Sequence, residues 1–215
     1  MLSLEGHSDE RCAMALVFHS VNKVVFSDDG SARSVLSDAT SVVLPGEMLA
    51  VMGPSGSGKT TLLQILGGRN MRDARGTIML AGEPFKKTMR KAIAFITQDD
   101  IFCPSICLTV RDHLTFAATM KLGDVGAHVR EARVEEIVGE MGLESCVNSP
   151  LILVSGGERK RASIGCEIAG KPSMMLVDEG TSGLDSSAAY TLMLTLTRLA
   201  KKEQIPVRYA SFYTR

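Results

Sequence analysis

Residues 53–60 (GPSGSGKT) have the types and spacing that bind the phosphates of a nucleotide. Glycines let such a loop curl so that successive N–H groups point at phosphate oxygens, and the following helix directs its positive N-terminus at the same anion. In this pattern Lys59 contacts the β- and γ-phosphates, and the Thr60 hydroxyl is a ligand of Mg²⁺. The residues expected to bind nucleotide here are Gly53, Pro54, Ser55, Gly56, Ser57, Gly58, Lys59, Thr60 and Thr61.

Chance matches to this pattern have to be weighed, because glycine occupies 20 of the 215 positions. In a chain of such composition a chance match is roughly a one-in-a-hundred event. This match also follows an apolar segment (MLAVM) and precedes a helical one (TTLLQIL), the context that phosphate binding requires. The sequence therefore predicts nucleotide binding.

An acidic pair, Asp178 and Glu179, ends a second apolar segment, MMLVD. A carboxylate at a strand end can hold Mg²⁺, usually through water, and its neighbour can polarise an attacking water as general base. Taken alone, the pair has about even odds of only capping the next helix. With the phosphate loop upstream, we expect Asp178 to be a metal ligand and Glu179 the base.

Ser155, Gly156 and Gly157 form another small-residue turn before a helix, hence a second anion site. The segments that surround these residues are specific: VSGGERKR, LTVRDHLTFAA and MMLVDEGTSGLDS. Together with the phosphate loop they resemble the ATP-binding cassette of ABC transporters, and in particular the G subfamily of half-transporters (the White and multidrug-resistance group). The resemblance runs from about residue 16 to about residue 200.

The resemblance implies a fold, a partner and further site residues. Two cassettes, identical or different, pack head to tail, so that each Ser155-Gly156-Gly157 loop covers the ATP of the other. Asp185 would then couple the two sites, and Gln98 would contact Mg²⁺ or the attacking water. A transmembrane domain follows the cassette in this group, which implies ATP-driven transport at the cytoplasmic face of a membrane.

The elements that must position these residues follow an α/β pattern. Residues 15–26, 42–52, 92–97 and 174–178 read as strands, and the turn-prone SDDGS separates the first two. Gly67 and Gly68 end the helix after the phosphate loop. Thr109 is the expected N-cap of the helix VRDHLTFAATMKL. Val134, Ile137, Val138 and Met141 share one apolar helix face.

We therefore predict a P-loop NTPase core with a mostly parallel sheet, an N-terminal antiparallel β subdomain and an inserted α-helical subdomain at about residues 100–150. Residues 1–14 are expected to be a tail, and residues 15–215 a nucleotide-binding domain without its C-terminal part and without the transmembrane domain.

Composition narrows the class of protein. Lys plus Arg equals Asp plus Glu, at 24 each, and aromatics are 5% with no Trp, so neither a basic field nor a stacking platform supports nucleic-acid binding. No apolar run approaches the roughly 20 residues that span a bilayer, and the N-terminus has no secretory pattern. The five cysteines show no CxxC spacing, which favours a reducing, cytosolic setting over disulfides or zinc.

The chain departs from the family pattern in four ways. The family has a histidine after the acidic pair, at the end of another strand, whereas IPVRYASFYTR occupies that place and the histidines are His7, His19, His113 and His128. The 215 residues include no segment expected to form the transmembrane domain. Lys23 stands where an adenine-stacking aromatic is usual, with Phe26 as the candidate substitute. Gly180 replaces a proline. These departures predict impaired hydrolysis and weak base selectivity.

Three functions remain open at this point. The first is the ATPase domain of a G-type half-transporter, and the second is a regulatory cassette that binds ATP and dimerises without productive turnover. The third is a cassette acting in translation or DNA maintenance; a single cassette and the lack of sustained heptads count against it. The charges of the run Glu158-Arg159-Lys160-Arg161 are read as a solvated helix face.

Overall fold

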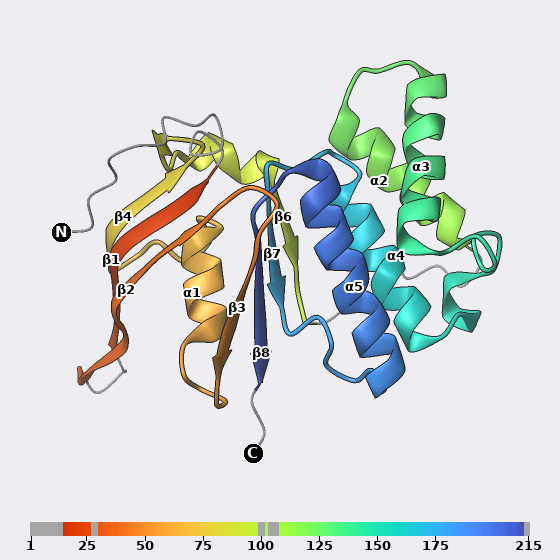
Figure 1. Ribbon diagram of the computed structural model, residues 1–215. Helices are drawn as coiled ribbons and strands as arrows, with labels where there is room; N and C mark the ends of the chain where they lie inside the picture. The colour runs from red at the N-terminus through yellow and green to blue at the C-terminus, as the bar shows by residue number, and fades with distance from the viewer. Residues whose placement is uncertain (1–14, 27–29, 99–101, 103–107, 213–215) are drawn as a thin grey trace.

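The computed structural model describes residues 15–26, 30–98, 102 and 108–212, which form two sheets and a group of helices (Figure 1). An antiparallel sheet has the strand order β2-β1-β4-β5, and a parallel sheet has the order β3-β8-β7-β6. The strands are β1 (Leu16–Phe26), β2 (Ala32–Val43), β3 (Met48–Gly53), β4 (Ala74–Leu80), β5 (Glu83–Pro84), β6 (Ile93–Ile96), β7 (Met174–Asp178) and β8 (Val207–Phe212).

Helix α1 lies between the two sheets, and the other α-helices lie on the far face of the parallel sheet (Figure 1). The helices are α1 (Lys59–Leu66), α2 (Val110–Leu122), α3 (Ala127–Met141), α4 (Gly156–Ile168) and α5 (Ser186–Glu203), with short 3₁₀ turns η2 (Lys87–Ala92) and η3 (Leu151–Leu153). The predicted fold, a parallel core with an antiparallel β subdomain and a helical subdomain, is confirmed.

Strand β7 explains why the core strands are continuous apolar runs. Met174 and Leu176 belong to the hydrophobic cluster around α1, whereas Met175 and Val177 belong to the cluster formed with α2 to α5. Because helices cover both faces of this sheet, alternate side chains are buried on opposite sides and no polar position is left. The phosphate loop, Gln98 and the acidic pair each come at the carboxyl end of a strand of this parallel sheet, namely β3, β6 and β7. The three therefore lie along the same side of the sheet, where its strands end.

The helical part is fixed by local signals that the sequence carries. Thr109 caps α2: its Oγ1 accepts a hydrogen bond from the Asp112 N–H, and the Asp112 carboxylate accepts one from the Thr109 N–H. The four apolar positions expected on one face of α3 are all buried. Helix α4 packs against both α2 and α3, so the helical layer continues to Ile168. No helix of the described residues combines the length and the apolar character needed to cross a membrane.

Two strands differ from the expectation. Strand β2 begins at Ala32, although its sequence, ARSVLSDATSVV, mixes polar and apolar residues and was expected to be strand only from residue 42. It lies at the edge of the antiparallel sheet, where exposed positions tolerate polar side chains. Strand β3 was expected to be buried, yet Met52 is 60% exposed, because β3 is an edge strand of the parallel sheet.

Candidate nucleotide-binding and catalytic site

Two glycines of the phosphate loop pack closely against other atoms, and at Gly58 the backbone conformation also favours glycine. Gly58 has φ +88°, and a Cβ there would come within 2.8 Å of the Val35 carbonyl oxygen on β2. A Cβ at Gly53 would lie 2.7 Å from the Ser57 hydroxyl. Since real Cβ atoms do not approach so closely, these glycines allow the loop to curl against β2 and lead into α1.

Lys59 is the first residue of α1, and its side chain folds back over the loop. It is 5% exposed, and its ammonium donates hydrogen bonds to the carbonyl oxygens of Gly53 and Pro54, both at 2.8 Å. These carbonyls hold the positive charge at the centre of the loop, where the phosphates of a nucleotide would require it.

Thr60 and Asp178, 118 residues apart in sequence, meet at this edge of the sheet. The Thr60 hydroxyl donates to Asp178 Oδ1 over 3.1 Å, which brings two oxygen ligands of the kind that Mg²⁺ prefers next to each other. Burial raises the pKa of Asp178 above its ordinary value, although the Thr60 hydrogen bond and Lys59 act in the opposite direction. A buried carboxylate of this kind is stabilised by a cation, so the donor set fits Mg²⁺.

Glu179 is 6% exposed, and its Oε2 is buried without a hydrogen-bond partner among the described residues. Burial raises the pKa of Glu179, and the adjacent Asp178 carboxylate raises it further. Asp185, and not the acidic pair, caps the next helix: its Oδ1 accepts hydrogen bonds from the N–H groups of Ser187 and Ala188 at 2.9 Å. The helix-capping alternative for the pair is therefore wrong, and Glu179 has the surroundings of a general base.

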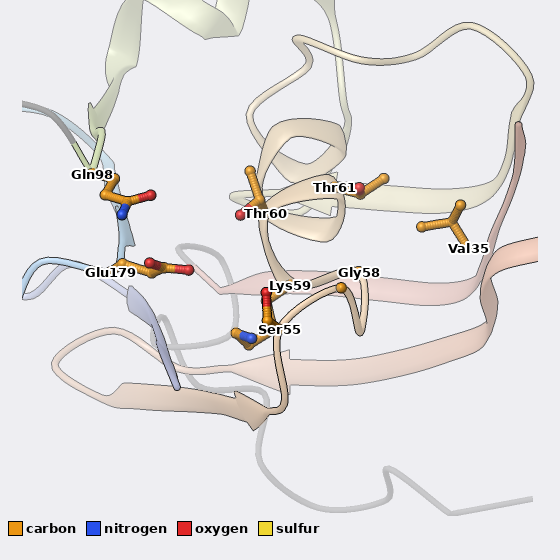
Figure 2. Close-up of a pocket in the computed structure, with 9 residues that line it drawn as sticks. Val35, Ser55, Gly58, Lys59, Thr60, Thr61, Gln98 and Glu179 are labelled. Atoms are coloured by element: carbon orange, nitrogen blue, oxygen red, sulfur yellow. The ribbon is translucent and has the colours of Figure 1, made fainter. Parts of the chain in front are cut away.

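A pocket of about 300 Å³ joins these groups (Figure 2). Figure 2 shows Gln98 and Glu179 on one side, with their side chains directed toward Thr60, and Val35 on the other side of the phosphate loop. The described residues that line the pocket are Val35, Ser55, Gly56, Gly58, Lys59, Thr60, Thr61, Gln98 and Glu179. Residues expected to bind the phosphates, the metal and the attacking water thus face one cavity.

Lys160 corrects the expectation of a solvated helix face. It is 4% exposed, and its ammonium donates to the carbonyl oxygens of Thr97 at 3.0 Å and of Gln98 at 2.9 Å. Arg159 also turns inward, with Nη2 within 3.5 Å of the Ile152 and Val154 carbonyl oxygens. The N-terminal part of helix α4 is therefore joined by the Lys160 hydrogen bonds to the segment that contains Gln98. Sequence reasoning missed Lys160, because a basic run has no signal for which member is buried.

Neither residue considered for the adenine contact lines the phosphate pocket. Lys23 is buried, and its ammonium donates to Asn70 Oδ1 and to the Arg72 carbonyl oxygen. Phe26 is 62% exposed and lines a separate hollow with Asn22, Val24 and residues 73–75, which includes no described residue of the phosphate loop. Because side chains alternate along β1, it is Val25 that faces the loop.

Val25 and Val35 line a hollow of about 380 Å³ with Arg33, Ser34, Gly56 and Ser57. This hollow shares Val35 and Gly56 with the phosphate pocket, so the two lie next to each other. A second hollow thus adjoins the phosphate pocket on this side of the loop.

The Ser155-Gly156-Gly157 turn opens helix α4 but is not among the described residues that line the phosphate pocket. Ser155 and Gly156 are exposed, and the adjacent Ile152 and Leu153 are 59% and 76% exposed. Gly180, where a proline was expected, has a packing reason: a Cβ there would lie 2.6 Å from Val177 Cγ1.

Comparison with known proteins gives consistent results. The family profile described as ABC transporter matches residues 36–182. The chain is similar to ABC transporter G family member 14 of Arabidopsis thaliana (43% identity over 174 residues, 78% of this chain and 26% of the relative). It is also similar to G family member 26 of Arabidopsis thaliana (43% over 195 residues, 86% and 28%) and to G family member 24 of Dictyostelium discoideum (37% over 205 residues, 89% and 18%). The chain spans about a quarter of the length of the first two.

A solved structure of the ATP-binding cassette MJ0796, a dimer in a post-hydrolysis state bound to ADP and Pi, has the same fold. It superposes with a TM-score of 0.75 at 24% identity and covers 91% of this chain and 87% of the solved chain.

Proposed function

This chain belongs to the ABC transporter family as an ATP-binding cassette similar to its G family, and on that premise we propose that it binds Mg-ATP, dimerises head to tail and hydrolyses the nucleotide to drive a half-transporter. The observation that carries the proposal is the contact of Thr60 with Asp178, next to Glu179 and across the pocket from Gln98. The phosphate loop, the Asp178 carboxylate and the Gln98 amide, which would position the attacking water, come together there, as phosphoryl transfer requires.

The chemistry follows from these positions. The phosphates lie on the loop N–H groups, with the Lys59 ammonium neutralising charge that develops during transfer. Mg²⁺, held by Thr60, Asp178 and Gln98, supplies further charge neutralisation when bound. The Glu179 carboxylate removes a proton from the attacking water while the water oxygen forms a bond to the γ-phosphorus. The bond from that phosphorus to the bridging oxygen breaks, and ADP and inorganic phosphate leave.

Head-to-tail pairing is proposed because the Ser155-Gly156-Gly157 turn begins at two exposed residues and is not among the described residues that line its own phosphate pocket. Each of the two sites would then be completed by the turn of the other protomer. Asp185, the N-cap of α5, lies beside this surface and would couple the two sites. The exposed Ile152 and Leu153 flank the turn and supply apolar area for such a contact. Because the relatives are named as ABC transporters, we further propose a transmembrane-domain partner and a place at the cytoplasmic face of a membrane.

A second candidate function is a cassette that binds ATP and dimerises with little turnover. Strand β8, which lies beside β7 and follows the acidic pair in sequence, carries no histidine. Slow phosphate release with normal ATP binding would favour this function, and release at the rate of intact cassettes would exclude it.

Two substitutions test the site. Lys59→Ala should abolish ATP binding in calorimetry, because the loop loses its central cation. Glu179→Gln should bind Mg-ATP as the parent does and lose most phosphate release. If Glu179→Gln hydrolyses ATP as fast as the parent, the assigned base is wrong.

Pairing is tested by light scattering of the Glu179→Gln protein with and without Mg-ATP, which should dimerise only with nucleotide. Adding Leu153→Asp should prevent the dimer while leaving nucleotide binding intact. Val129→Asp, at a position on α3 that is 43% exposed, is the matched control and should leave the dimer unchanged. Equal dimerisation of both variants would contradict the proposed interface.

A further inference from the structure

The loop after β7 is attached to strand β8 at two points. The Glu179 N–H donates to the Ala210 carbonyl oxygen over 3.1 Å, and the hydroxyls of Thr181 and Tyr209 lie 2.5 Å apart. The two contacts bracket Gly180, and they involve consecutive residues of β8. The part of the loop that follows the acidic pair is thus held by β8 from both sides of Gly180.

Glu179 needs such support because its backbone is strained. Its φ is +51°, a left-handed conformation that a non-glycine residue adopts at a cost of about 1–2 kcal/mol. Such conformations persist where the surroundings fix them. Here the Glu179 carbonyl accepts the Ser182 N–H at 2.9 Å, and Gly180 packs so closely on Val177 that there is no room for a side chain at this position.

Tyr209 is the side chain best placed to hold this turn. It is 3% exposed, its ring belongs to the core cluster shared with α5, and a Cβ on Gly180 would lie 3.4 Å from its Cε2 atom. A buried phenol hydroxyl requires a hydrogen-bond partner, and Thr181 is the partner that the structure gives it.

We propose that Tyr209 is a positioning residue for catalysis, which holds the Glu179 carboxylate in place by binding Thr181. The proposal rests on the assignment of Glu179 as the base. Tyr209 is not among the described residues that line the phosphate pocket, so its proposed effect reaches the chemistry through the backbone of residues 179–181.

Tyr209→Phe keeps the ring and removes the hydroxyl, and Thr181→Val removes the partner. We expect each to lower kcat about 3- to 10-fold with KM for ATP changed less than about twofold, the size of one lost hydrogen bond. The double variant should be no slower than the slower single variant, because both remove one interaction. Tyr190→Phe, on α5 and 66% exposed, is the matched control and should leave kcat unchanged.

A second measurement does not depend on turnover. Hydrogen exchange of the amides of Glu179 and Ser182 should be faster in Tyr209→Phe than in the parent, while amides of α1 remain unchanged. If parental turnover is absent, or Glu179→Gln is as active as the parent, the proposed function fails and the exchange data alone decide this inference. Unchanged exchange at both amides overturns it, as do additive effects of the two substitutions on kcat.

Discussion

Arg208 on β8 offers the sharpest test of how packing decides the stability of this protein. Its neighbours in the parallel sheet are Leu49 and Leu176, and its guanidinium lies over the Phe18 ring, 4.3 Å from the centroid. It is 5% exposed, and its Nε and Nη1 atoms have no hydrogen-bond partner in the part of the chain described. The Arg208 guanidinium is therefore a buried cation next to the hydrophobic cluster that surrounds α1. We predict that Arg208→Met stabilises the fold.

The magnitude follows from burial. Burial lowers the pKa of Arg208 from 12.5 to about 10. Since one pKa unit corresponds to about 1.4 kcal/mol, keeping the guanidinium charged costs about 3 kcal/mol. Because this folded-state pKa is lowered, the penalty is fully present at neutral pH and is lost only as pH rises above about 10. The cation–π contact with Phe18 returns about 0.5–2 kcal/mol, and methionine keeps the unbranched apolar stem.

The expected gain for Arg208→Met is thus about 1–3 kcal/mol in the free energy of unfolding, or about 2–10 °C in Tm for a domain of this size. Urea unfolding followed by circular dichroism at pH 7 measures it as a higher midpoint with an unchanged m value. Arg72→Met is the control, because the Arg72 side chain is 94% exposed, and it should change stability by less than about 0.5 kcal/mol. A destabilised or unchanged Arg208→Met protein would refute the reasoning.

Three further predictions follow from the site. Without nucleotide, Asp178→Asn should raise Tm at pH 7, because the raised folded-state pKa of Asp178 means that its ionisation destabilises the fold above that pKa, an effect that is lost as pH falls toward 3.8. Calorimetry should show a smaller gain in Tm at pH 4 than at pH 7, and magnesium-dependent phosphate release should be lost. Lys160→Met should lower kcat by about tenfold or more and leave ATP binding unchanged, because the Thr97 and Gln98 carbonyl oxygens lose their hydrogen-bond donor. Lys201→Met, at an exposed position on α5, should leave kcat unchanged, and equal rates for the two variants would show that Lys160 is not needed. GTP should bind within about tenfold of ATP by calorimetry, because the Val25 and Val35 side chains carry no polar group that could distinguish guanine from adenine. A much larger preference for ATP would contradict a base contact made by these two side chains and would indicate that Arg33, Ser34 or Ser57 reads the base.

The local parts of the site could be predicted from the sequence. The phosphate loop, its helix and the Thr109 cap depend on residues a few positions apart, whose backbone conformations and caps are encoded where they stand. The apolar runs of β6 and β7 predicted buried strands for the same reason, because full burial on both faces leaves no polar position.

Long-range contacts could not be predicted in this way. Whether Lys160 is solvated or reaches Gln98, 62 residues away, depends on how α4 packs against the end of β6. Likewise, the sequence indicated Phe26 as the ring contact, and only the orientation of β1 in its sheet turns Val25 toward the phosphate loop.

The sequence by itself determined that this chain is a cassette with a phosphate loop, an acidic pair and a Ser155-Gly156-Gly157 turn, because each of these is a contiguous motif. Only the tertiary structure decided that Thr60 meets Asp178, that Tyr209 holds Thr181 and that Arg208 is buried beside Phe18. The physical reason is that strand order and register, set by the packing of all the elements together, choose which distant side chains come into contact.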